Sequence, residues 1–156
     1  MSDDQKMLHD LAHEFAENEI FPVSAEYDQR NEFAWPVIKK AHEVGLMNLN
    51  IPEEYGGPGL TALDELIITE ELTWGCAGIG ASIGINALAA WPILIGGNAG
   101  QKKEWLGRLI DGQLASYCLT EPAAGSDVAH IRTTARRVGD KYVLNVTKTF
   151  ITNPTV

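Results

Sequence analysis

Apolar residues recur at helical spacing through the first two thirds of the chain. A capping-box pattern at Ser2 and Gln5 begins a first helix, whose apolar stripe continues to Phe21. Pro22 is expected to disturb this helix. Further helices are predicted where the spacing returns with a cap or Pro at its start: 35–44, 61–74 and 101–111. A loop rich in Pro and Gly, 50–60, lies between the predicted helices 35–44 and 61–74.

The stretch from Gly75 to Gly100 has no charged residue and exceeds the roughly 20 residues that a bilayer crossing needs. It is interrupted by repeated glycines and by Asn86, Pro92 and Asn98, and only Trp91–Ile95 is densely apolar. We therefore interpret it as a buried helix of a bundle and not as a membrane span.

The hydrophobic period changes from helical to alternating after Gly112. Three or four strands are predicted, with a hairpin turn at Gly139 joining the middle pair: 115–119, 131–137, 142–146 and 149–152. The predicted fold class is α+β, an all-α helical bundle (1–113) followed by the first strands of an antiparallel β-domain (114–156). Because these strands cannot close a sheet, we expect a truncated domain or a partner that covers the open edge.

Length and charge narrow the function classes. The 156 residues have a formal net charge of −9, with 16 acidic and 4 basic side chains in residues 1–74 and 8 basic and 5 acidic ones in residues 101–156. An acidic first half argues against nucleic-acid or membrane-surface binding, whereas the second half tolerates a phosphorylated ligand. Cys76 and Cys118 have no disulfide or zinc spacing, and no secretory signal precedes them, which favours a reducing compartment.

Two histidines imitate a zinc motif. His9 and His13 are four residues apart in HDLAH, which differs from the zinc pattern HExxH by Asp10. On a helical projection they fall opposite the apolar stripe, so we interpret them as surface residues and predict no metal site.

The chemically informative residues lie in two motifs, YCLTEPAAGSD at Tyr117–Asp127 and KTFITN at Lys148–Asn153. A strand that runs into a Pro-set turn and small residues offers backbone on which a flat ligand or a phosphate could lie. From the residues alone, an ordinary strand-to-strand loop with a local turn at Ser126–Asp127 is the favoured interpretation.

The two motifs at this spacing resemble the flavin-binding signature of the acyl-CoA dehydrogenases. Upstream, IPEEYGGPGL (51–60), EEL (70–72), GCAG (75–78) and GQKKEWLGRLIDG (100–112) stand in the order of medium-chain-like members. The resemblance implies a helical N-terminal domain, a β-barrel middle domain and a C-terminal four-helix domain. The chain departs from the pattern at Ala123 and Val146, where Gly is common, and after Asn153.

The resemblance also implies a role for each motif residue toward FAD. The backbone of Tyr117, Cys118 and Leu119 would line the flavin. The Thr120 hydroxyl would bond its pyrimidine side. Gly125 and Ser126 would lie at the FAD diphosphate. Phe150 and Ile151 would lie against the flavin, and Thr152 would lie near its N5 atom. Ser126 would also contact the acyl-CoA substrate.

The reaction implied is α,β-dehydrogenation of an acyl-CoA thioester to a trans-2-enoyl-CoA, with hydride transfer to flavin N5. The family's carboxylate base lies in the C-terminal domain, and Glu121 is expected to be a structural carboxylate, so the isolated chain is predicted to bind FAD weakly and to be inactive. The resemblance also implies an electron-transfer flavoprotein as partner and a homo-oligomer, namely a tetramer. It implies a location in the bacterial cytoplasm or the mitochondrial matrix. Related oxidases share these motifs. The alternative is a non-catalytic helical interaction module.

Overall fold

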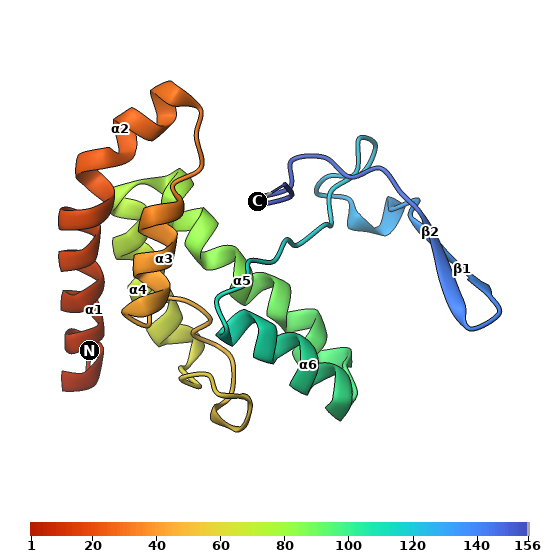
Figure 1. The fold of residues 1–156 in the computed structure, drawn as a ribbon, viewed down its shortest axis with the longest axis horizontal. Coiled ribbons are helices and arrows are strands. Elements are labelled where there is room, and N and C mark those ends of the chain that lie inside the picture. The colour runs from red at the N-terminus through yellow and green to blue at the C-terminus, as the bar shows by residue number, and fades with distance from the viewer. Residues whose placement is uncertain (156) are drawn as a thin grey trace.

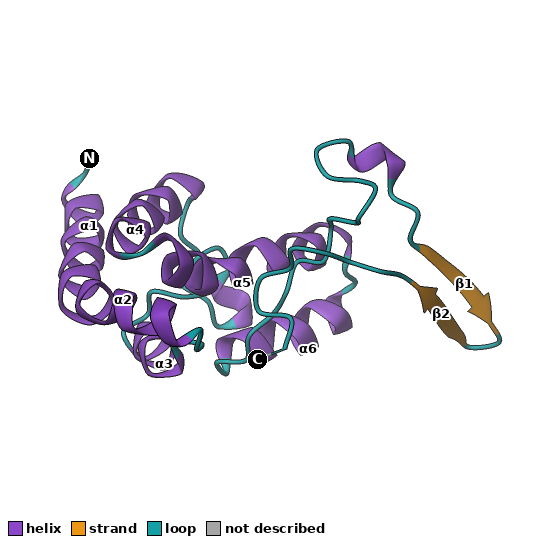
Figure 2. Ribbon diagram, turned by 90° about the horizontal axis from the view of Figure 1, so that it is seen from above, coloured by secondary structure: helices purple, strands orange, loops and turns teal. Residues whose placement is uncertain are grey.

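The computed structural model describes residues 1–155, in which helices precede a single β-hairpin (Figure 1). The elements are α1 Asp3–Phe15, α2 Phe21–Arg30, α3 Trp35–Glu43, α4 Ala62–Gly75, α5 Ala77–Gly96, α6 Ala99–Ile110, β1 Thr134–Val138 and β2 Lys141–Asn145. Helix α1 packs on α4, α4 on α5, and α5 on α6. The hairpin projects from the far end of this helical unit (Figure 2). The predicted α+β class, with helices first, is confirmed.

Side-chain caps fix where the main helices begin. The capping boxes predicted at Ser2 and Thr61 are both present, each closed by a reciprocal bond from the residue three positions later. A third box was not predicted: Asn98 Oδ1 accepts from Gln101 N at 2.9 Å, and Asn98 N donates to Gln101 Oε1 at 2.9 Å. Each box satisfies backbone N–H groups that the first helical turn leaves without partners.

The disturbance expected at Pro22 is a change of helix type and does not end the helix. Residues Ala16–Ile20 form a π-helical segment between α1 and α2, and Pro22, which has no N–H to donate to the preceding turn, lies in the first turn of α2. The π segment packs closely on the end of α4 at Gly75. A Cβ built on Gly75 would lie 3.1 Å from both Ala16 Cβ and Ile20 Cγ2. The absence of a side chain at this position lets the two helices approach.

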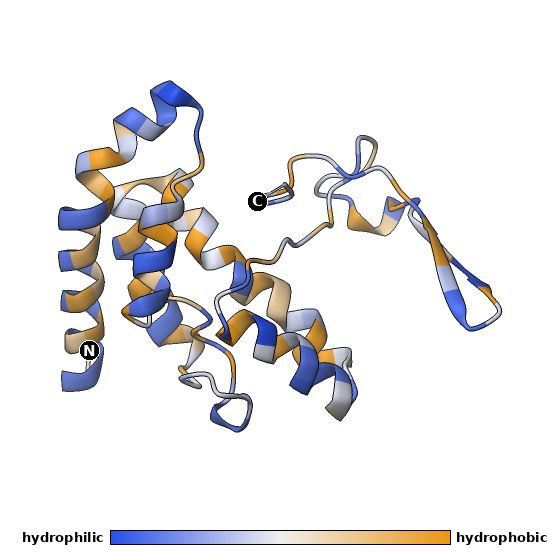
Figure 3. Cartoon of the chain, viewed as in Figure 1, coloured by the Kyte–Doolittle hydropathy of each residue, from blue (hydrophilic) through white to orange (hydrophobic). Residues whose placement is uncertain are grey.

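The core divides into two apolar clusters that share α5. Figure 3 colours each residue of the helices by its hydropathy. The larger one lies among α1, α3, α4 and the first half of α5, and the smaller one joins α5 to α6 around Ile51 and Leu106. Within residues 1–155, α5 alone is long and apolar enough to cross a membrane, but only 33% of its most apolar window is buried. The prediction of a buried helix therefore holds for one face of α5, which includes Ile83, Asn86 and Ala90. It fails for the face with Leu88, Trp91 and Ile95, which are exposed.

Two of the predicted strands do not form. β1 pairs antiparallel with β2, with Thr134 opposite Asn145 and Val138 opposite Lys141, and this is the whole sheet in residues 1–155. Segments 115–119 and 149–152, predicted as strands, have no strand pairing, and the second of them bends at Phe150 and Thr152. A strand requires a neighbouring backbone ladder, which hydrophobic alternation cannot reveal.

The two histidines of HDLAH are partly exposed at the surface, and they also contact α4, which was not predicted. His9 Nε2 lies 3.2 Å from Glu71 Oε1, and His13 Nδ1 lies 2.6 Å from Glu71 Oε2, on the neighbouring helix α4. The projection of one helix shows which residues oppose its apolar stripe, but it does not show how far the next helix wraps around it. The pair therefore contributes to the contact between α1 and α4.

Candidate functional site

The two motifs lie side by side after the chain has left the helical unit. Thr149 N donates to Thr120 O at 3.1 Å, and Lys148 Nζ donates to Leu119 O at 2.9 Å. At the other end of the contact, the Ser116 hydroxyl is 2.9 Å from Thr152 O. Residues 116–121 and 148–153 thus form a two-segment strip, although 26 residues lie between Glu121 and Lys148 in the sequence.

Glu121 is the most heavily bonded side chain of the strip. It is 7% exposed and accepts from Arg132 N at 2.8 Å, from Thr133 N at 2.9 Å and from Lys148 Nζ at 2.9 Å, in addition to a short bond from the Thr133 hydroxyl. The Thr133 hydroxyl, the Arg132 N–H and the Lys148 ammonium, in that order, lower the pKa of Glu121 to about 2, against the effect of desolvation. The carboxylate is therefore ionised at neutral pH.

Those contacts give Glu121 a structural part in the site. A general base needs a pKa near the operating pH and a lone pair directed at the substrate. Both Glu121 oxygens are occupied by donors within the chain, and its pKa is far below neutrality. The structure agrees with the expectation that this residue is a carboxylate of the loop. The Glu121–Lys148 ion pair, together with the Lys148 bond to Leu119 O, ties the first motif to the second.

The small-residue turn of the first motif is closed by two backbone bonds. Glu121 N donates to Ala124 O at 3.0 Å, and Ala124 N donates to Glu121 O at 3.1 Å. Ala124 is buried beneath the turn, whereas Gly125 and Ser126 are exposed. A Cβ on Gly125 would meet no atom within 4 Å, and Gly125 does not have a positive φ. The fold of this chain therefore does not itself require glycine there, which leaves room for close approach of a ligand.

The second motif holds an aromatic residue in a strained conformation. Phe150 has φ 55° and is 92% exposed, so its ring has almost no contact with the chain. A bulky residue in the left-handed region is costly and tends to occur at functional sites. Thr152 is half-buried beside it, and within residues 1–155 no hydrogen bond engages the hydroxyl of Thr152 or of Thr120.

The structure brings some of the predicted site residues together and leaves others apart. Hydrogen bonds across the two-segment strip involve the backbone of Leu119, Thr120 and Thr152. The same two segments also contain Tyr117, Cys118 and Ile151. Among residues 1–155, no hydrogen bond joins Gly125 or Ser126 to the second motif. The sequence reasoning assigned no role to three residues that fix the strip: Ser116, Thr133 and Lys148. Of these, Lys148 belongs to the second motif. A lysine that is largely buried needs a partner of opposite charge, and this requirement is the signal that could have identified it.

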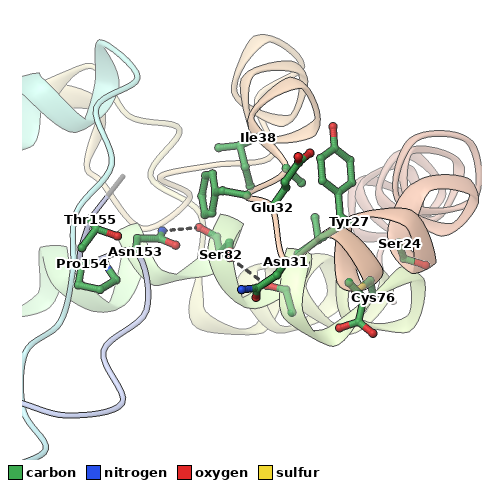
Figure 4. Close-up of a pocket in the computed structure, with 15 residues that line it drawn as sticks. Ser24, Tyr27, Asn31, Glu32, Ile38, Cys76, Ser82, Asn153, Pro154 and Thr155 are labelled. Carbon is green, nitrogen blue, oxygen red and sulfur yellow. Dashed lines mark hydrogen bonds between the residues drawn. The ribbon is translucent and has the colours of Figure 1, made fainter.

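A cavity of about 560 Å³ lies where the second motif meets the helical unit. Figure 4 shows Asn153 directed at Ser82 of α5, and Asn153 Nδ2 donates to Ser82 O at 3.0 Å. The opposite wall comes from the end of α2 and the loop after it, including Asp28 and Glu32. These carboxylates make the cavity a poor place for a phosphate group. The contact of Asn153 with Ser82 anchors the strip to α5.

Both halves of the chain match domains of one family. Residues 2–113 match the acyl-CoA dehydrogenase N-terminal domain, and residues 116–156 match the acyl-CoA dehydrogenase middle domain. The chain belongs to the acyl-CoA dehydrogenase family. A probable medium-chain specific acyl-CoA dehydrogenase 2, mitochondrial, of Caenorhabditis briggsae is 42% identical over 153 residues, which are 97% of this chain and 38% of that protein. This acyl-CoA dehydrogenase chain thus spans about two fifths of that relative's length.

Solved structures share the acyl-CoA dehydrogenase fold. The acyl-CoA dehydrogenase of Bacillus anthracis, complexed with FAD, superposes with a TM-score of 0.88 at 38% identity, over 98% of this chain and 27% of that one. A chain from the structure of the electron transferring flavoprotein of Acidaminococcus fermentans superposes with a TM-score of 0.91 at 38% identity, over 99% of this chain and 41% of that one. The relatives include mitochondrial and bacterial proteins.

Proposed function

We propose that this chain is the N-terminal part of an FAD-dependent acyl-CoA dehydrogenase that converts an acyl-CoA thioester to a trans-2-enoyl-CoA. The observation that supports the proposal best is the two-segment strip, in which Thr120 and Thr152 come from motifs far apart in the sequence yet belong to adjacent segments joined by hydrogen bonds. Glu121 and Lys148 hold this surface before any ligand binds. A preformed site of this kind lowers the entropic cost of binding.

The exposed groups of the strip fit an isoalloxazine with its phosphates. The Thr120 and Thr152 hydroxyls are without partners among the described residues and are available to polar ring atoms. The open space beside Gly125 admits a diphosphate next to the backbone, where Ser126 would donate to it. Phe150, exposed and strained, would cover the ring, with Ile151 adjoining it. When bound, FAD supplies the hydride acceptor that amino-acid side chains lack.

The chain's own residues have defined tasks in this proposal. The backbone of Tyr117, Cys118 and Leu119 lines the flavin edge, and the Lys148 ammonium holds that backbone through Leu119 O. Ser126 also contacts the acyl-CoA. Glu121 does not remove the substrate α-proton, because its pKa is about 2 and its oxygens are bonded internally. We therefore expect the 156-residue chain to bind FAD weakly and to show no turnover by itself.

Domain division, partners and location complete the proposal. We place the helical domain at 1–113 and the partial β-domain at 114–156. The electrons would pass to an electron-transfer flavoprotein, and the complete enzyme would be a homo-oligomer in a bacterial cytoplasm or a mitochondrial matrix. The second candidate, a non-catalytic interaction module, is favoured by one feature: every residue of β1 and β2 is exposed, and both outer edges lack a strand partner within residues 1–155.

Titration of the chain with FAD tests the proposal, with flavin fluorescence and absorbance as readouts. Loss of one hydrogen bond is worth about 1 kcal/mol, so Thr120→Val and Thr152→Val should each raise the Kd for FAD about fivefold. Thr147→Val is the matched control, because Thr147 is exposed and lies outside the proposed contacts. Absence of any FAD binding, with colourless oligomers instead, would favour the interaction module. Flavin reduction by short- or medium-chain acyl-CoA would contradict the expected lack of turnover.

A further inference from the structure

Two imidazoles and one carboxylate join α1 to α4 on the side of the molecule away from the two motifs. His9 Nε2 is 3.2 Å from one oxygen of Glu71, and His13 Nδ1 is 2.6 Å from the other. The two rings are nearly parallel, with centroids 6.0 Å apart and an interplanar angle of 2°. The side chain of Glu71 is 15% exposed, so this carboxylate depends on the imidazoles for its hydrogen bonds.

The position of His9 between two carboxylates favours an imidazolium. Its Nε2 faces Glu71 Oε1, while its Nδ1 lies 2.9 Å from Asp10 Oδ1. Ionised carboxylates only accept hydrogen bonds, and a neutral imidazole has a single N–H, so the neutral ring would set one lone pair against a carboxylate oxygen. The charged ring carries an N–H on each of these two nitrogens, so it hydrogen-bonds Asp10 and forms an ion pair with Glu71. His13 differs, because its single bond to Glu71 needs one N–H, which either protonation state supplies.

The charges around His9 favour its protonated form. On its own helix, Asp10 and His13 flank it; on α4, Glu71 and Glu70 face it. Two neighbouring polar pairs are bonded to each other: Gln5 Nε2 donates to Asp64 Oδ1 at 3.0 Å, and Lys6 donates to Asp3 at 3.2 Å. The hydrogen bond with Asp10, followed by the charges of Glu71, Asp10 and Glu70, raises the pKa of His9 above 6.5, and partial burial opposes this.

The cluster adjoins the point where α1 meets the end of α4. The His13 ring stacks on Trp74 with centroids 4.8 Å apart, and Trp74 in turn stacks on Phe21 at 6.0 Å. The residue after Trp74 is Gly75, on which the π-helical segment packs. A change in the contacts of the cluster would therefore alter the packing where α1, the π-helical segment and α4 meet.

We propose that His9, His13 and Glu71 form a pH-sensitive histidine clasp that fastens α1 to α4 in mildly acidic solution and loosens as the pH rises. The sign follows from linkage. A histidine whose pKa is higher in the folded state stabilises the fold fully below its unfolded-state pKa, and that contribution is lost as the pH rises through the folded-state pKa. The histidine clasp is independent of FAD and of catalysis.

A double-mutant cycle on the 156-residue chain tests the histidine clasp. The variants are His9→Gln, Glu71→Gln and the double variant, compared by urea unfolding at about pH 5.5 and about pH 9. At the lower pH we expect a coupling of about two- to fivefold in the unfolding equilibrium constant, typical of a part-exposed pair. At the higher pH the coupling should vanish. Glu43→Gln is the matched control, since Glu43 is exposed on α3, and no hydrogen bond or ion pair engages its side chain within residues 1–155.

An equal coupling at both pH values, or none at either, would overturn the proposal. NMR titration of the His9 ring in the unmodified chain decides the matter even if a variant fails to fold. We expect His9 to titrate above 6.5, and to return toward that value in Glu71→Gln. Titration of His9 at or below 6.5 in the unmodified chain would refute the histidine clasp.

Discussion

Replacement of Asn86 by alanine should loosen the junction between the helical unit and the first motif. Asn86 is fully buried in α5, and its side chain bonds three groups: Nδ2 donates to Asn48 Oδ1 at 3.1 Å and to Gln113 O at 3.0 Å, and Oδ1 accepts from Ala115 N at 2.7 Å. Asn86→Ala leaves all three without their partner. Taking about 1 kcal/mol for each lost bond gives a destabilisation of about 3 kcal/mol. For a chain of this size the Tm should fall by about 6–12 °C.

Thermal and urea unfolding, followed by far-UV circular dichroism, measure this effect. Gln113→Ala is the matched control, because only the backbone carbonyl of Gln113 accepts the bond and its side chain is exposed. This control should change the free energy of unfolding by less than about 0.5 kcal/mol. A Tm of Asn86→Ala within about 2 °C of the unmodified chain would show that the three bonds contribute nothing net, and our reasoning would be wrong.

Three other outcomes are expected. Glu121→Gln should weaken FAD binding and expose the Thr149 amide to hydrogen exchange. Because the pKa of Glu121 is lowered to about 2, the stabilising effect of this carboxylate should be complete above about pH 4.5 and disappear as the pH falls toward 2. An acid unfolding titration that the substitution leaves unchanged would contradict this. Gly57→Ala should destabilise the chain by about 3 kcal/mol in urea, because the new Cβ would lie 2.0 Å from Ile51 O. Gly107→Ala, in open space on α6, should instead raise the stability by about 0.5–1 kcal/mol, and a loss there would refute the distinction.

Local signals predicted the helices well because their causes are local. The capping boxes at Ser2 and Thr61 act within four residues, and the hairpin turn at Gly139 has φ 66°, as its sequence indicated. The box at Asn98 carried the same type of signal and was overlooked. The π-helical segment before Pro22 was not predictable from spacing, because it depends on the close approach of Gly75 on another helix.

The candidate site depended on information that periodicity does not contain. Segments 115–119 and 149–152 are predicted as strands, yet they are held by single contacts such as Thr149 N to Thr120 O. That the two motifs lie together was implied by family resemblance, whereas the reason they do so, the Glu121–Lys148 ion pair, is a tertiary contact. Whether the named residues bind FAD stays a prediction.

The Glu121–Lys148 pair also closes the base of a long excursion of the chain. Everything between these two residues, including the hairpin, leaves the strip and returns to it through this contact and through the bonds of Glu121 to Arg132 and Thr133. The tip of the hairpin at Gly139 therefore tolerates insertion: a peptide tag or a fluorophore placed there would lengthen a closed loop, whose entropic cost grows slowly with its size. Such a tag would report on the chain without displacing the base at which the two motifs meet.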